Sequence, residues 1–182
     1  MQTKFRALSL SHKTAPVQIR ELISLDEEAI QRILLKLKDF FSLSDALVIS
    51  TCNRTEVYYS HELDLSTEII KLLGLEKGIT DVVNYLDYFE VFNQDIDAIQ
   101  HLFRVAMGLE AQVIGDIQIS NQVKRAYQTA ADLQMAGPFL HRLMHTIFFT
   151  NKRVVQETSF RDGAASLSYA TIELIESLTA NT

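Results

Sequence analysis

The stretch ALVISTCNRTEVYY, residues 46–59, decides the fold of the first half of this chain. Residues 46–50 form a short apolar run rich in β-branched side chains, which predicts a buried strand. Residues 51–55 are polar and predict a turn, and residues 56–59 predict a second strand. Two strands of this kind need a further apolar surface, so the sequence on either side must supply helices and more strands.

The flanking segments supply those elements. A polar, proline-containing segment between the first strand and the first helix predicts a loop that carries function. Acidic residues in the first turn favour the start of the first helix, and an aromatic-rich segment predicts the last strand. In chain order we expect a strand at 5–10, a loop at 11–22, a helix from Asp26 to Phe41, a helix from Ser66 to Leu73 stopped by Gly74, and a strand within 84–92. The sum is α+β: a ferredoxin-like βαββαβ sheet domain.

From Asn93 onward the pattern becomes almost continuously helical. Glycine and proline punctuate it and predict helices at about 95–112, 117–134, 138–157 and 164–180. We therefore expect three parts: a ferredoxin-like half over 1–92, a helical half over 93–160, and the start of a long helix over 161–182.

Composition narrows the classes of function. The 182 residues are 47% hydrophobic and 22% charged, as in ordinary globular proteins. A formal net charge of −6 argues against an electrostatically driven nucleic-acid binder, although a local basic patch is compatible with it. A single cysteine excludes a disulfide framework and fits a reducing compartment. We find neither a membrane-spanning run nor a secretory signal, and expect a cytoplasmic location.

Cys52 and His101 are the residues best suited to chemistry. Cys52 lies in the polar turn after a buried strand, and the guanidinium of Arg54 would favour its nucleophilic thiolate form. His101 lies in a predicted helix, where it is suited to acid–base work. For each there is a plain alternative: a lone cysteine is more often an inert small side chain, and such a histidine is more often half-buried without a role.

Cofactor motifs are missing from the sequence. His141 and His145 have helical i, i+4 spacing, but no third ligand accompanies them, so we expect no metal. The chain has no GxGxxG, Walker or GxSxG motif, so we expect no dinucleotide to bind here in the usual way.

Several segments together resemble the N-terminal catalytic domain of glutamyl-tRNA reductases. The most specific is STCNRTE at 50–56. The others, in order, are SHKTAPV at 11–17 with Arg20 and Glu21, HLFRVA at 101–106 with Gly108 and Leu109, VIGD at 113–116 with Gln118, KRV at 152–154 with Glu157 and Thr158, and SLSYA at 166–170. The resemblance spans nearly the whole chain.

The resemblance implies a reaction and a site. Cys52 would attack the ester of glutamyl-tRNA to give a thioester, which NADPH would reduce to glutamate-1-semialdehyde in 5-aminolevulinate and tetrapyrrole biosynthesis. It implies Cys52 and His101 as catalytic residues, with His101 acting as an acid–base or as a positioner. It implies substrate contacts from Thr51, Asn53, Arg54, Ala111, Asp116, Ile117, Gln118 and Gln122.

The resemblance also implies what lies outside this chain. NADPH would bind a separate domain, so this chain would be a fragment competent for acylation only. The full-length enzyme would be a homodimer, and a downstream aminomutase would be a partner. The departures from the family pattern are Ala111 for a common serine, Asp116 for a common glutamate, Ile117 for a common proline and Asn121 for a common glycine.

The sequence also leaves open two functions of other classes. A ferredoxin-like sheet is also the layout of RNA-recognition modules, in which Tyr58 and Tyr59 would be the stacking aromatics. Against it, the strands lack the aromatic pattern of those modules. The helical half would alternatively serve as a protein-interaction domain.

Overall fold

The computed structural model describes residues 4–158 and Phe160. In chain order the elements are β1 (Lys4–Ser11), α1 (Val17–Ile23), α2 (Glu27–Phe41), β2 (Ala46–Thr51), β3 (Arg54–His61), α3 (Ser66–Glu76), the 3-10 helix η1 (Val82–Tyr88), β4 (Glu90–Phe92), α4 (Asp95–Ala106), α5 (Ile117–Asp132) and α6 (Pro138–Glu157). The predicted helix at 164–180 lies outside the described residues. Within them, no helix is both long enough and apolar enough to cross a membrane.

The four strands form one sheet in the order β2-β3-β1-β4, and every neighbouring pair is antiparallel. β1 and β2 are therefore parallel to each other with β3 inserted between them. This is the ferredoxin-like βαββαβ order, which confirms the predicted α+β class.

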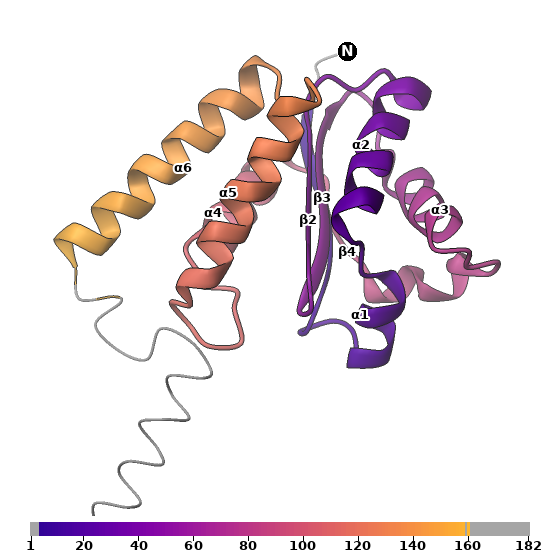
Figure 1. Ribbon diagram of the computed structural model, residues 1–182, viewed down its shortest axis with the longest axis horizontal. Helices are drawn as coiled ribbons and strands as arrows, with labels where there is room; N and C mark the ends of the chain where they lie inside the picture. The colour runs from indigo at the N-terminus through magenta and orange to yellow at the C-terminus, as the bar shows by residue number, and fades with distance from the viewer. Residues whose placement is uncertain (1–3, 159, 161–182) are drawn as a thin grey trace, which may run out of the picture.

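The sheet lies between two layers of helices (Figure 1). Helices α1, α2 and α3 cover one face, and α4, α5 and α6 lie on the other. Because side chains alternate across a strand, β3 sends Arg54, Glu56 and Tyr58 toward the α4 side and Val57 and Tyr59 toward the α2 side. The α4 side of β3 thus carries the charged residues of the STCNRTE segment.

Three predicted elements need correction. The predicted loop at 11–22 contains α1, which starts at Val17 directly after Pro16, a residue with extended backbone at a ψ of 162°. The predicted strand within 84–92 is mostly η1, because Tyr85 and Tyr88 pack against the core, and only Glu90–Phe92 pairs with β1. The predicted helix 95–112 ends at Ala106, because Gly108 takes a φ of +79° and turns the chain back.

The prediction that Gly74 stops a helix is also wrong. Helix α3 continues through it to Glu76, and the left-handed residue after the helix is Gly78, with a φ of +67°. Gly74 is buried, and a Cβ built on it would lie 2.5 Å from Cβ of Val82. A glycine is needed here for the close approach of η1, not for a turn.

Gly74→Ala is expected to lower the free energy of unfolding by about 1–3 kcal/mol, because overpacking against Val82 outweighs the better helix propensity of alanine. Urea unfolding of the chain measures this. The double variant Gly74→Ala/Val82→Ala relieves the overpacking. Its loss of unfolding free energy should therefore be smaller than the sum of the losses of the two single variants. Full additivity of the two single changes would contradict the packing argument.

Hydrogen bonds attach the layer of α4, α5 and α6 to the start of β2. The backbone N–H of Ala46 donates to the carbonyl of Met135 over 2.8 Å. The buried Asp45 carboxylate accepts from the backbone N–H of Leu140, in the first turn of α6, over 3.2 Å. These contacts fix the helical layer on the sheet at the end opposite the β2–β3 turn.

Candidate active site

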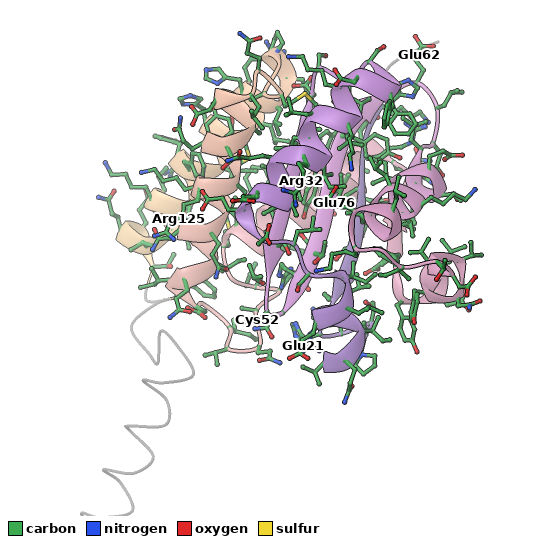
Figure 2. The ribbon with its side chains drawn as sticks, turned by 45° about the vertical axis from the view of Figure 1, so that its right-hand side comes forward. Glu21, Arg32, Cys52, Glu62, Glu76 and Arg125 are labelled. Carbon is green, nitrogen blue, oxygen red and sulfur yellow. The ribbon has the colours of Figure 1, made fainter. Side chains whose placement is uncertain are left out.

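The β2–β3 turn presents Cys52 at one end of the sheet (Figure 2). Thr51 and Arg54 pair across the ladder, so Cys52 and Asn53 form the two-residue tip. The Thr51 Oγ1 accepts from the backbone N–H of Asn53 over 3.2 Å, which holds the tip. Cys52 is exposed and forms no disulfide. An exposed thiol is thus carried by a tightly paired part of the sheet.

The segment after β1 holds the same turn from outside. The backbone N–H of His12 donates to the carbonyl of Asn53 over 2.9 Å. Nε of Arg20 donates to the carbonyl of Cys52 over 3.3 Å, and its Nη1 donates to the carbonyl of Ala15. The SHKTAPV segment and Arg20 therefore act together on the turn, which only the fold reveals.

A cavity of about 260 Å³ opens beside Cys52. It is somewhat smaller than the roughly 300–1,000 Å³ of sites for drug-sized ligands, and it suits a group of aminoacyl size. Predicted site residues line most of it: Thr51, Cys52, Asn53, Arg54, Ala111, Asp116, Gln118 and Gln122. The remaining lining residues are Gln112, Val113 and Ile119.

Ile117 is not among the lining residues and is 43% exposed. Sequence reasoning missed Gln112, Val113 and Ile119 as site residues. The helix predicted through 95–112 hid the loop that brings Gln112 and Val113 to Cys52, and the apolar Ile119 is typical of a core position of the next helix. Asp116 lines the cavity and also caps α5, since its Oδ1 accepts from the backbone N–H of Gln118 over 2.9 Å. Its carboxylate is therefore fixed by the helix that it starts.

Behind Cys52 lies a buried charged network centred on Glu56, which is 0% exposed. Nη1 of Arg54 donates to Oε1 of Glu56 over 2.9 Å, and the guanidinium of Arg54 is 2% exposed. The hydroxyls of Ser9 and Tyr58 donate to the same carboxylate over 2.7 and 2.6 Å. The ion pair offsets part of the positive charge that Arg54 would otherwise present to a thiolate.

His101 completes this network from α4. Its Nε2 lies 3.1 Å from Oε1 of Glu56, and its ring stacks on Phe92 at a centroid distance of 4.3 Å. Burial opposes ionisation of Glu56, but the hydrogen bond from His101 and the charge of Arg54 outweigh it and lower the pKa of Glu56 to about 2. An ionised carboxylate only accepts, so the proton of neutral His101 must lie on Nε2.

His101 does not line the cavity of Cys52. It lines a second cavity of about 440 Å³, together with Lys13, Phe92, Arg104, Glu110 and others. Arg54 lines both cavities. The predicted site residues thus lie around two cavities that share Arg54, and Glu56 joins Arg54 to His101.

Acid is expected to destabilise the fold through Glu56. Because its folded-state pKa of about 2 is below the ordinary value, its ionised form stabilises the fold above about pH 4.5, and this is lost as pH falls toward 2. Over that window Glu56→Gln should reduce the pH dependence of the unfolding free energy by up to about 1.4 kcal/mol per pH unit. Urea unfolding at a series of pH values measures it. The exposed Glu62 offers the control Glu62→Gln, and equal slopes for both variants would contradict the assignment.

Burial decides the alternative function as an RNA-binding sheet. Tyr58 and Tyr59 are both 0% exposed, so the prediction that they form a stacking surface for RNA is wrong. They were misassigned because both sheet faces are covered by helices. His141 contacts the hydroxyl of Tyr127, and among the described residues no group of three or more His, Cys, Asp or Glu side chains is placed to hold a metal.

Comparison with known proteins identifies the family. The family described as "Glutamyl-tRNAGlu reductase, N-terminal domain" matches residues 8–158. The chain belongs to this family. A glutamyl-tRNA reductase of Cytophaga hutchinsonii is 57% identical over 182 residues, which are 100% of this chain and 43% of that protein. One of Desulfatibacillum aliphaticivorans is 39% identical over 168 residues, 92% of this chain and 38% of that protein.

A solved structure agrees with the family. Glutamyl-tRNA reductase from Methanopyrus kandleri matches with a TM-score of 0.76 and 30% identity, covering 95% of this chain and 39% of that one. The chain thus has the α+β fold of the family's N-terminal domain, and it spans about two fifths of the length of these relatives.

Proposed function

We propose that this domain performs the acyl-transfer step of a glutamyl-tRNA reductase, with Cys52 as the nucleophile. The observation that carries the proposal is the placement of an exposed cysteine on a cavity of aminoacyl size, lined by eight of the predicted site residues. The thiolate of Cys52 attacks the ester carbonyl of glutamyl-tRNA and a carbon–sulfur bond forms. The ester carbon–oxygen bond breaks, and the terminal ribose oxygen of the tRNA leaves with the electron pair and takes up a proton.

The cavity supplies the means to hold the glutamyl group. Arg54 uses one N–H for Glu56 and one for the carbonyl of Glu110, which leaves other N–H groups of the guanidinium for a substrate carboxylate. Thr51, Asn53, Gln118 and Gln122 add neutral polar groups around the same space. The glutamyl group carries both a carboxylate and an amino group, so it needs both charged and neutral polar partners.

His101 has a defined capacity for proton transfer. With the proton of neutral His101 on Nε2 and donated to Glu56, Nδ1 is the nitrogen that exchanges a proton with substrate. Since His101 lines the second cavity, we place its action on the tRNA side of the ester. There Nδ1 first takes up a proton from solvent, and the imidazolium then gives that proton to the leaving ribose oxygen and returns to the neutral form. Glu56 accepts from Nε2–H throughout and holds the ring in place.

NADPH would supply the hydride that reduces the thioester to glutamate-1-semialdehyde. The sequence holds no glycine-rich loop that would cradle a dinucleotide pyrophosphate, so the residues of this chain do not fit that cofactor. The chemistry assigned to this chain therefore ends at the thioester.

The proposal extends to the substrate, the pathway and the assembly of the whole enzyme. We propose that the substrate is glutamyl-tRNA and that the product enters tetrapyrrole biosynthesis through an aminomutase partner. The full-length enzyme is proposed to be a cytoplasmic homodimer. We propose that residues 1–92 and 93–160 form the two halves of the catalytic domain. The start of the long helix proposed over 161–182 lies outside the described residues.

The test is to mix the chain with glutamyl-tRNA in the absence of NADPH and to measure intact mass. A glutamyl adduct that peptide mapping assigns to Cys52, or glutamate release that needs Cys52, supports the proposal. Glutamate release that is unchanged without Cys52 would overturn it. Where neither adduct nor release is seen, supplying the full-length relative's remaining domains separates a docking requirement from an inactive cysteine.

A further inference from the structure

One wall of the cysteine cavity is a loop between α4 and α5, residues 107–116. Two glycines with positive φ lie near its ends, Gly108 at +79° and Gly115 at +86°, and the backbone N–H of Gly115 donates to the carbonyl of Gly108 over 3.0 Å. Its residues 111–113 all line the cavity. The loop is thus closed at its base, and its placement depends on what holds its middle.

Glu110 holds the middle of the loop. It is 7% exposed, and its carboxylate pairs with the ammonium of Lys13, in the segment after β1, and with the guanidinium of Arg104, at the end of α4. Burial opposes ionisation, but the two cations outweigh it and the pKa of Glu110 is lowered. A carboxylate clamped by two cations from two other elements fixes the position of its own backbone.

That backbone contacts the site. The carbonyl of Glu110 accepts from Nη2 of Arg54, while Nη1 of Arg54 is held by Glu56. The guanidinium is therefore fixed at both ends, by a side chain of its own strand and by the backbone of the loop. The orientation of the Arg54 guanidinium toward the cysteine cavity therefore depends on the position of Glu110.

We propose that Glu110 is a positioning residue for acyl transfer: clamped by Lys13 and Arg104, it sets the orientation of Arg54 and the wall at Ala111, and so places the substrate carboxylate relative to Cys52. The inference rests on the proposed function for its substrate, but the placement of Arg54 can be measured without any substrate. Lys13 and Arg104 act through Glu110 and share the role.

The chain offers a matched control. Glu76 in α3 is also nearly buried, with a side chain 6% exposed, and is held by Nε of Arg32 and Nζ of Lys36, each over 2.6 Å. Arg32 and Glu76 lie together on the helical layer away from Cys52 (Figure 2). Glu76→Gln thus removes a carboxylate clamped by one arginine and one lysine, as in Glu110→Gln, without touching either cavity.

The first measurement is the ratio of Cys52 alkylation rates by anionic iodoacetate and neutral iodoacetamide. If Glu110 acts only through its charge, Glu110→Gln removes a nearby negative charge and raises the ratio. If Glu110 positions Arg54, the cation turns from the cavity and the ratio falls, by at least threefold. Glu110→Asp, which keeps the charge, should recover at least half of the loss, and Glu76→Gln should keep the parent ratio.

The second measurement is glutamyl-tRNA discharge by the same variants. Glu110→Gln should lower kcat/KM by about 10-fold to 100-fold, with most of the change in KM, whereas Glu76→Gln stays within twofold of the parent. A parent chain that shows no discharge counts against the proposed function, while the alkylation ratio still decides the role of Glu110. A ratio for Glu110→Gln that equals or exceeds that of the parent overturns the positioning role.

Discussion

Cys52→Ser is expected to release glutamate from glutamyl-tRNA about 10³-fold more slowly than the parent chain, or slower still. At neutral pH a thiol offers a fraction of its strongly nucleophilic thiolate, whereas an unactivated serine hydroxyl does not. We expect His101 to act on the leaving oxygen and not as base for a serine at the turn, since it lines the other cavity. The measurement is single-turnover release of labelled glutamate without NADPH.

The stability of the chain serves as control for this result. Cys52 is exposed at the tip of the turn, so serine should change the free energy of unfolding by no more than about 0.5 kcal/mol. A loss of activity with unchanged stability is then a chemical effect. A serine chain that discharges glutamyl-tRNA at the parent rate would show that the nucleophile is water or another residue.

Arg54→Met is expected to have the largest effect on stability, a loss of about 3–5 kcal/mol. Methionine has a similar length, but it leaves Glu56 as a buried carboxylate without its cationic partner, at 0% exposure. It also leaves the carbonyl of Glu110 without the N–H that it accepts. Urea unfolding at neutral pH measures the loss.

The control is an exposed ion pair. Arg153 and Glu157 face each other at i, i+4 on α6, each 56% exposed, so Arg153→Met should cost less than about 1 kcal/mol. The double variant Arg54→Met/Glu56→Met should be more stable than Arg54→Met alone, because no unpaired charge stays buried. Equal losses for Arg54→Met and Arg153→Met would refute the buried network.

A buried ion pair at this position is better explained by function than by stability. Apolar residues of similar volume are often as stable as a buried pair, so stability alone gives little reason for a charged centre between two cavities. Arg54 lines both cavities, and Glu56 joins it to His101. The network keeps a cation and an oriented imidazole next to the space in which we place the glutamyl ester.

The sequence by itself determined the strands β1, β2 and β3, the main helices and the turn that carries Cys52. These features are local, because alternation of side chains in residues 46–59 and helical periodicity in residues 27–41 each depend on neighbours along the chain. It also placed Ala111, Asp116, Gln118 and Gln122 near Cys52, though only through resemblance to a family. Composition and periodicity contain nothing that links them to the turn.

Only the tertiary structure decided what depends on contacts between distant segments. The sequence predicts that Gly74 ends a helix, whereas the structure shows that Gly74 makes room for Val82. The sequence also predicts helix for residues 107–112, whereas the structure shows a loop in which Glu110 contacts Lys13 and Arg54. Likewise only the structure shows that His101 lines a different cavity from Cys52 and is joined to Arg54 through Glu56. Packing and buried charge act through space, and the order of residues along the chain does not record which segments they join.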